Sequence, residues 1–203
     1  MLIKVVIINL DSVLLNVDVS GLISRLRELL KIDSDLRGLI AEAMLSFSDK
    51  SKAEKIDDIL SEFEERTAEE AYVDQNDLEA ICTLKAIGVK LALVTMRRRK
   101  STEKALERIG LKDLFDVVIT RDDEPEKTLQ LIRACTSLGH KVEEALYVGF
   151  SRADVVAGVQ AGCLVATPHK VVQALSKTIR VSSLHELLDI VKFELSPLAK
   201  SSN

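Results

Sequence analysis

The chain has 203 residues, of which 47% are hydrophobic and 30% charged, and its 28 Lys and Arg against 32 Asp and Glu leave a formal net charge of −4. This length suits one globular domain of about 100 to 200 residues with room for an insertion. A mildly acidic chain has no general attraction to phosphate backbones or anionic lipid, so we expect neither a nucleic-acid nor a membrane partner. The three cysteines lie far apart and suggest no metal or redox pair.

The chain opens with a β-branched run that is typical of a strand buried on both faces. Residues 3–9 are apolar apart from Lys4 and Asn9. The run is far shorter than the roughly 18 residues of a membrane span, and no cleavage pattern follows it, so we expect a cytoplasmic protein. A strand buried on both faces belongs in a parallel sheet that helices cover on each side.

The next stretch, residues 16–72, breaks the strand pattern and carries apolar residues at helical spacing. These positions are Leu22, Ile23, Leu26, Leu29 and Leu30 in a first segment and Ile56, Leu60 and Phe63 in a second. Residues 48–52 read as a polar turn between helical segments. We therefore expect a small all-helical cap inserted after the first strand.

From residue 73 onward, strand patterns alternate with helix patterns. We expect strands at 89–95, 116–120, 145–149, 163–167 and 178–181, and helices at 98–109, 127–138, 153–161 and 184–191. Another helix should end at Gly88, with Asn76 and Glu79 spaced as a capping box at its start. The alternation predicts an α/β fold with a doubly wound parallel sheet. Its core would comprise residues 1–15 and 73–195, with the cap at 16–72 and a tail at 196–203.

Polar residues follow three of the expected strands. Asn9 and Asp11 come after the first strand, Thr95 and Arg97 after the second, and Asp154 shortly after a later one. Ligands of open parallel sheets bind beyond the carboxyl ends of the strands. These residues are therefore candidates for one shared site.

The order of these motifs resembles the haloacid dehalogenase superfamily, and most of all its phosphoglycolate phosphatase and β-phosphoglucomutase branch. The matching segments are Asn9-Leu10-Asp11, Thr95, and Gly149-Phe150-Ser151-Arg152-Ala153-Asp154, together with a helical cap right after the first motif. The resemblance implies a Rossmann-like core and magnesium-dependent phosphoryl transfer through an aspartyl-phosphate, a reaction in which a carboxylate attacks and Mg²⁺ neutralises the phosphoryl oxygens.

The resemblance also assigns roles to individual residues. Asn9 stands at the nucleophile position, and Asp11 at that of the acid and base. Thr95 and a lysine would hold the phosphoryl group, with Arg97 beside them, and Asn9, Asp11 and Asp154 would form a weak or vestigial metal site. Glu124 falls where the family commonly has its lysine, and Lys127 is the nearest substitute, so both remain candidates for that position.

Two departures from the family pattern weigh against its chemistry. The carboxamide of Asn9 is a poor nucleophile without charge, and Phe150, where the family has a metal-ligating carboxylate, offers no oxygen to Mg²⁺. Asn9 alone would suit an engineered inactive variant, whereas natural loss of activity explains both changes.

We therefore expect a phosphatase-like protein with lost or strongly impaired hydrolysis, a pseudoenzyme that binds a small phosphorylated ligand or a protein partner. The alternative is a working phosphatase on a small phosphate ester with a nonstandard nucleophile. The oligomeric state is not indicated. The basic run 97–100 at a helix start is either a solvated surface or a contact for an anionic partner.

Overall fold

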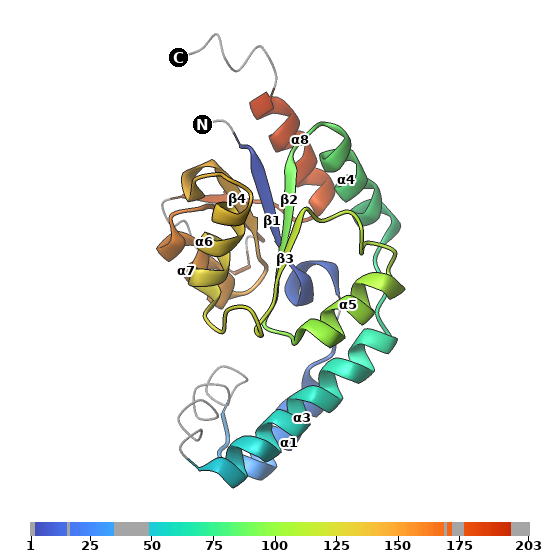
Figure 1. Cartoon of the computed structure of the whole chain (residues 1–203), viewed down its shortest axis with the longest axis vertical. Helices are drawn as coiled ribbons and strands as arrows, with labels where there is room; N and C mark the ends of the chain where they lie inside the picture. The colour runs from blue at the N-terminus through green and yellow to red at the C-terminus, as the bar shows by residue number, and fades with distance from the viewer. Residues whose placement is uncertain (1–2, 16, 35–48, 169, 172–176, 196–203) are drawn as a thin grey trace. The chain divides into compact units, whose positions relative to one another are not determined.

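The structure is a computed structural model that describes residues 3–15, 17–34, 49–168, 170–171 and 177–195. It divides into two compact units, one of residues Met1–Asn16 and Ala71–Asn203 and one of residues Val17–Glu70. The expected tail at 196–203 lies outside the described residues. Both units contain helices, and the strands belong to the larger one (Figure 1).

The larger unit is built on a six-stranded sheet with the order β3-β2-β1-β4-β5-β6. The strands are β1 (Val5–Asn9), β2 (Lys90–Val94), β3 (Val117–Ile119), β4 (Ala145–Val148), β5 (Leu164–Thr167) and β6 (Thr178–Arg180). All five pairings are parallel. This confirms the expected doubly wound parallel sheet, with strands slightly shorter than their apolar runs.

Helices cover both faces of this sheet. They are α4 (Gln75–Ala86), α5 (Arg99–Arg108), α6 (Lys127–Ser137), α7 (Arg152–Ala161) and α8 (Leu184–Leu195), with a π-helical turn η1 (Leu10–Leu14) and a 3-10 turn η3 (Val142–Glu144). Helix α6 packs against β1, β2 and β3 and against α7, which covers β5. Helix α4 packs on α8 and β2, on the other side of the sheet (Figure 1).

The apolar residues of β1 explain the two-sided cover. Val5 and Ile7 belong to one buried cluster with Leu131 of α6 and Val155 of α7. Every residue of β1 is buried, so the side chains that point to the opposite face from Val5 and Ile7 are buried as well. A strand without a polar face can only be satisfied between two layers of helices.

The start of α4 differs from the expectation. Asp74, in an extended conformation, caps the helix and accepts a hydrogen bond from the Asn76 amide at 2.8 Å. The capping box expected at Asn76 and Glu79 is therefore wrong, because an Asp two residues earlier already satisfies the amides of the first turn. Helix α7, by contrast, starts at a capping box formed by Ser151 and Asp154.

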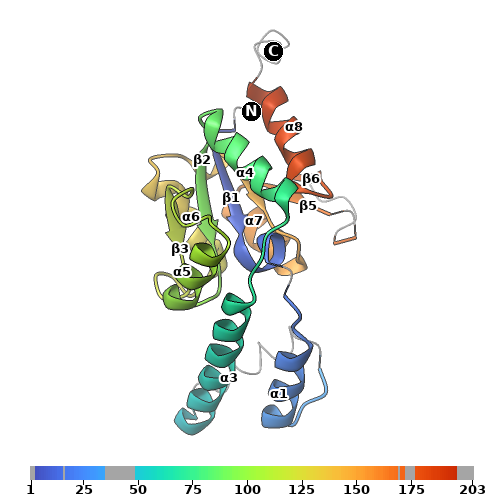
Figure 2. The same ribbon diagram turned by 90° about the vertical axis from the view of Figure 1, so that its right-hand side faces the viewer.

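The smaller unit contains a helical pair, α1 (Ser20–Leu30) and α3 (Lys50–Glu69) (Figure 2). Leu22, Leu26 and Leu30 of α1 form a buried cluster with Ile56 and Ile59 of α3. The polar turn expected at 48–52 is wrong in its second half, because Lys50 already begins α3. Asp49 caps this helix by accepting a hydrogen bond from the Lys52 amide at 3.2 Å.

Within the described residues, no helix is both long enough and apolar enough to cross a membrane.

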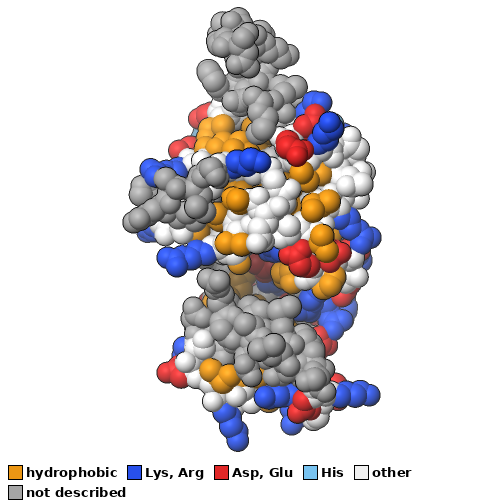
Figure 3. Space-filling model, turned by 90° about the vertical axis from the view of Figure 1, so that its left-hand side faces the viewer, with side chains coloured by type: hydrophobic (Ala, Val, Ile, Leu, Met, Phe, Trp, Pro, Cys, Tyr) orange, Lys and Arg blue, Asp and Glu red, His pale blue; other side chains and the backbone are white. Residues whose placement is uncertain are grey.

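Some apolar side chains of α6 and α7 are exposed, among them Leu129, Ile132 and Val156. The face seen in Figure 3 carries hydrophobic side chains in several separate groups among charged and other polar ones. Apolar side chains scattered in this way are ordinary on a protein surface.

Candidate functional site

The candidate residues meet at the carboxyl edge of the three central strands. Asn9 ends β1 and is paired with Val94 of β2, so Thr95 follows directly beside it. On the other side of β1, β4 ends at Val148, and the loop to α7 follows. Because all three strands run in the same direction, their following residues share one edge of the sheet.

Asp154 is the centre of this cluster. It lies at the third position of α7 and is only 1% exposed. Its carboxylate accepts six hydrogen bonds. Oδ1 accepts from Asn9 Nδ2 at 2.7 Å, from the Tyr147 hydroxyl at 2.8 Å and from Lys127 Nζ at 3.2 Å. Oδ2 accepts from the Ser12 hydroxyl at 3.0 Å, from the Ser151 amide at 3.1 Å and from the Ser151 hydroxyl at 2.6 Å. A carboxylate has about four lone-pair positions, so this one is saturated.

Ser12 fixes the direction of these hydrogen bonds. Its hydroxyl accepts from Asn9 Nδ2 at 2.9 Å and from the Phe150 amide at 3.2 Å, which leaves its own proton for Asp154. Both N–H groups of the Asn9 amide are thereby used, one on Ser12 and one on Asp154. The network therefore requires an amide nitrogen at residue 9.

The electrostatics of the cluster follow from burial and from Lys127. Burial by itself would raise the pKa of Asp154, but the Lys127 charge and the donors around the carboxylate outweigh burial and hold the pKa below its ordinary value. The buried Tyr147 hydroxyl has a pKa well above its ordinary value, because of its burial and because Asp154 is negative. Asp154 is thus a carboxylate and Tyr147 a neutral donor.

Asp11 forms a second group with the residues that follow β2. Its carboxylate accepts from the Thr95 hydroxyl at 2.8 Å and from Arg97 Nε at 2.5 Å. The Arg97 side chain is only 3% exposed, whereas that of Asp11 is 34% exposed. Thr95 and Arg97, two of the three side chains expected to bind the phosphoryl group, therefore hold a carboxylate of the chain itself.

The basic run 97–100 has acidic partners within its own unit. Arg98 lies 3.8 Å from the Asp122 carboxylate, and Arg99 forms an ion pair with Asp123 at 2.5 Å. Asp122 also accepts a hydrogen bond from the Arg99 amide at the start of α5. The unfavourable position of cations at a helix start is thus offset by carboxylates beside it.

Lys127, rather than Glu124, supplies the ammonium of the cluster. Lys127 begins α6 and reaches Asp154, and its side chain is 17% exposed. The Glu124 carboxylate instead accepts from the Glu126 amide at 3.1 Å in the loop before α6. Phe150 lies in the loop after β4 and is partly buried, and its backbone amide donates a hydrogen bond to the Ser12 hydroxyl.

Gly149 allows the loop to approach α7. A Cβ atom at this position would lie 2.3 Å from Cβ of Asp154, a distance that no side chain can tolerate. The absence of a side chain is what brings the start of α7, and with it Asp154, against the ends of the strands.

Three residues of the site were not singled out by the sequence. Tyr147 is the only polar side chain of β4, and Ser12 stands three positions after Asn9 in the turn η1; both patterns could have indicated them. Gln130 is fully buried and donates to the carbonyls of Thr95 and Glu124, but its position on a helix gives no such signal. Among the described residues, Asn9 Oδ1 and Gln130 Oε1 are buried acceptors without a partner.

Comparison with known proteins identifies the family. The model of the haloacid dehalogenase-like hydrolase family matches residues 28–167. The chain belongs to this family. The resemblance of its motifs to the haloacid dehalogenase superfamily is thereby confirmed.

Curated relatives of this chain include phosphatases. A phosphoglycolate phosphatase of Chromobacterium violaceum is 29% identical over 136 residues, which are 64% of this chain and 61% of that protein. Pyrophosphatase PpaX of Bacillus cereus is 36% identical over 124 residues, 56% of this chain and 55% of its own. The match therefore spans only about three fifths of the length of these relatives.

A solved haloacid dehalogenase-like hydrolase of Streptococcus pneumoniae has the same fold. It superimposes with a TM-score of 0.69 at 14% identity, over 94% of this chain and 98% of its own. At this identity the likeness concerns the fold alone.

Phosphatases of the family generally use Mg²⁺, and the residues of this site do not fit that ion. Magnesium is held by carboxylate and other oxygens at near-octahedral positions. Here the Asp154 oxygens are saturated by donors, one of them an ammonium, and Asp11 is held by Arg97. Asn9 Oδ1 has no hydrogen-bond partner among the described residues but carries no charge, and Phe150 has no oxygen to offer the ion. Within the described residues, no three His, Cys, Asp or Glu side chains come together as a metal site.

Proposed function

We propose that this chain is a hydrolase-like protein that has lost magnesium-dependent phosphomonoester hydrolysis and binds a small phosphorylated ligand without a metal. One observation carries the proposal. The Asp154 carboxylate is occupied by the amide of Asn9 at 2.7 Å and by the ammonium of Lys127 at 3.2 Å, where the family pattern provides a carboxylate nucleophile and a metal ion.

The charges of the site support this proposal. Asp11 and Asp154 contribute two negative charges, and Arg97 and Lys127 contribute two positive ones, so the cluster is balanced by its own side chains. Carboxylates at positions 9 and 150 would add two negative charges, which is the charge that one Mg²⁺ neutralises. Exchanging both for uncharged groups removes the electrostatic need for the ion.

The chemistry of Asn9 supports the loss of hydrolysis in a second way. A carboxamide is a poor nucleophile, and this one donates both of its N–H groups to Ser12 and Asp154. Formation of an aspartyl-phosphate requires a carboxylate at this position. The acid and base position, Asp11, is held in an ion pair with Arg97.

Phosphate binding is supported by the donors that face Asp11. A carboxylate and a phosphoryl group are both anionic acceptors and are recognised by the same hydroxyl and guanidinium groups. Asp11 is one-third exposed, so its side chain can rotate outward while the buried Arg97 stays in place. We infer that a phosphoryl group exchanges with Asp11 on Thr95 and Arg97.

Hydrolysis is tested with p-nitrophenyl phosphate and Mg²⁺. We expect no release of nitrophenol above that of the Thr95→Ala variant, and a gain of magnesium-dependent release in the double variant Asn9→Asp, Phe150→Asp. If the unaltered chain clearly releases nitrophenol and Thr95→Ala abolishes this release, the proposal is wrong. That result would favour a working phosphatase with a nonstandard nucleophile.

Binding is tested by thermal unfolding in inorganic phosphate with a chelator present. A ligand that binds only the folded state raises the unfolding temperature with its concentration. We expect such a rise without Mg²⁺, and a larger one in Asp11→Asn, because the competing carboxylate is gone. Asp113→Asn, a change at an exposed loop position, should behave as the unaltered chain does. If phosphate shifts neither protein, phosphate recognition is lost as well, and a protein partner becomes the better explanation.

A further inference from the structure

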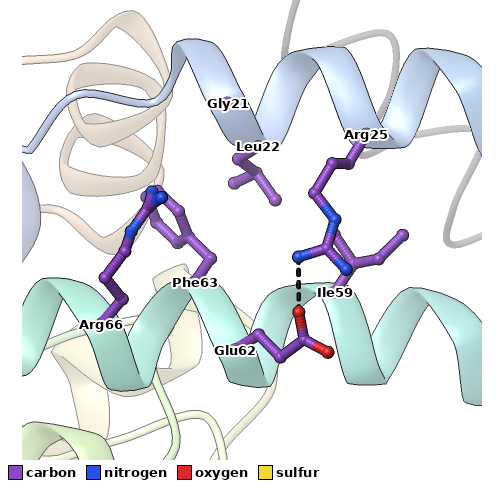
Figure 4. A pocket seen from close by; sticks show the side chains of 7 residues that line it. All are labelled: Gly21, Leu22, Arg25, Ile59, Glu62, Phe63 and Arg66. Carbon is purple, nitrogen blue, oxygen red and sulfur yellow. Dashed lines mark hydrogen bonds and ion pairs between the residues drawn. The ribbon is translucent and has the colours of Figure 1, made fainter.

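A cavity lies between the two helices of the smaller unit and shares no described lining residue with the candidate site. It has a volume of about 150 Å³, and the described residues that line it belong to α1 and α3 (Figure 4). Cavities of roughly this size, lined by apolar side chains, accommodate a ring such as benzene. The proposed function makes no use of this cavity.

One part of the cavity wall is apolar. Leu22 projects from α1 toward α3, and Ile59 and Phe63 come from α3 (Figure 4). Leu22 and Ile59 are buried members of the core between these helices, and Phe63 packs against the same cluster. An apolar body that entered the cavity would therefore contact a surface already sheltered from water.

The other part of the wall is charged, and the described side chains there include two arginines and one glutamate. Arg25 of α1 forms an ion pair with Glu62 of α3 at 2.6 Å, which joins the helices at one side of the cavity (Figure 4). At the other side, the guanidinium of Arg66 lies 5.9 Å from the centre of the Phe63 ring. Among the described lining residues, two arginines stand against one glutamate, and the nearby Asp18 carboxylate also feels the charge of Arg66.

Arg66 has donors available for a ligand. Within the described residues, its guanidinium contacts the face of Phe63 and donates no hydrogen bond. The nearby Asp18 carboxylate accepts from the amide and the hydroxyl of Ser20, both at 2.9 Å. An anion in the cavity would thus meet a guanidinium whose planar donors match the two oxygens of a carboxylate.

Gly21 keeps this side of the cavity open. A Cβ atom at this position would meet a single neighbour, Arg66 Nη2 at 3.9 Å. A larger side chain would therefore fit the backbone without a clash while filling the space beside the guanidinium.

We propose that this cavity binds a small aromatic carboxylate, with its ring against Leu22, Ile59 and Phe63 and its charge on Arg66. The volume suits a body of one ring, and the guanidinium of Arg66 suits a carboxylate. The ring of the ligand would contact these apolar side chains, and its carboxylate would accept charge-assisted hydrogen bonds from the Arg66 guanidinium.

The experiment titrates the whole chain with benzoate and follows binding by ligand-detected NMR. Benzamide has the same ring without the charge, and benzylamine has the opposite charge. We expect binding of benzoate, about tenfold weaker binding of benzamide, and none of benzylamine, since a hydrogen bond to a charged group contributes about that much to affinity. Equal binding of the three compounds would overturn the assignment of Arg66.

Two variants locate the site. Arg66→Gln should weaken benzoate binding about tenfold, whereas Arg108→Gln, the same change at an exposed arginine of α5, should leave it unchanged. Gly21→Leu keeps every charge and should abolish binding by filling the cavity. Circular dichroism and thermal unfolding establish that each variant is folded. Unchanged binding in both Arg66→Gln and Gly21→Leu, or no benzoate binding by the unaltered chain at millimolar concentration, would refute the proposal.

Discussion

At the scale of single residues, Lys127 supplies the positive charge beside the buried carboxylate of the candidate site. Its ammonium lies 3.2 Å from Asp154 Oδ1, and Asp154 is 1% exposed. Lys127→Met should lower the free energy of unfolding by about 2 kcal/mol, less than the roughly 3 to 5 kcal/mol of a fully buried pair, because five other hydrogen bonds remain. Urea denaturation measures the loss. The control Lys112→Met removes an exposed lysine and should change stability by less than about 0.5 kcal/mol.

The same pair predicts a pH dependence. The pKa of Asp154 in the folded state lies below its ordinary value of 3.8, so the ionised carboxylate stabilises the fold at neutral pH. That contribution is lost as the pH falls below about 4 and through the folded-state pKa. In Lys127→Met the pKa should rise, and the loss of stability should begin at a higher pH. Identical acid-unfolding midpoints for the two proteins would contradict this role of Lys127.

Asn9 is the second residue whose replacement is informative. Asn9→Asp would set a carboxylate oxygen about where Nδ2 now donates, 2.7 Å from Asp154 Oδ1. Two carboxylates at such a distance cannot both stay ionised, so one must take up a proton. The variant should melt at a lower temperature than the unaltered chain at pH 8 and recover most of the difference at pH 5. An equal loss of melting temperature at both pH values would show that the variant is destabilised by altered geometry and not by charge repulsion.

At the scale of elements, α7 depends on close packing against the sheet. A Cβ atom at Gly158 would lie 2.5 Å from Val165 Cγ2 and 2.9 Å from Tyr147 Cδ1. Gly158→Ala should therefore destabilise the chain by about 1 to 3 kcal/mol, even though alanine favours a helix. Thermal unfolding measures the change. Gly21→Ala, where a Cβ atom meets no close neighbour, should be neutral or slightly stabilising, and a similar loss in both variants would contradict the argument.

The elements themselves were largely predictable, and their ends were not. The run at residues 5–9 is buried on both faces, and a pattern of this kind has one solution, a central parallel strand. Sequence alone does not determine the start of α4, because Asp74 and Asn76 are both good capping residues. The extended backbone conformation at Asp74 decides between them. The start of α3 at Lys50 was missed because polar residues at a helix start resemble a turn.

The site was predictable in its members but not in its connections. The ends of parallel strands determine that residues after β1, β2 and β4 meet, and the family motifs indicated which ones. No sequence rule showed that Asp11 would accept from Thr95 and Arg97 or that Ser12 would complete the shell of Asp154, because such hydrogen bonds depend on side-chain directions.

At the scale of the whole molecule, the two units have separate cores of different extent. The sheet unit buries a large cluster that includes β1, β2 and β4, whereas the helical unit buries Leu22, Leu26, Leu30, Ile56 and Ile59. Small cores open locally at a lower free energy than the centre of a parallel sheet. We therefore expect amides of α1 and α3 to exchange with solvent faster than those of β1 when hydrogen exchange is followed by mass spectrometry.

Leu26→Ala tests whether this opening is local. Leu26 is 1% exposed in the helical core, and its truncation should cost about 2 to 5 kcal/mol. If the units open separately, exchange in α1 and α3 should rise by at least about tenfold while exchange in β1 stays unchanged. Leu131→Ala, in the core of the sheet unit, should instead accelerate exchange in β1. Equal acceleration of all elements in both variants would mean that the chain unfolds as one cooperative body and would contradict separate opening of the units.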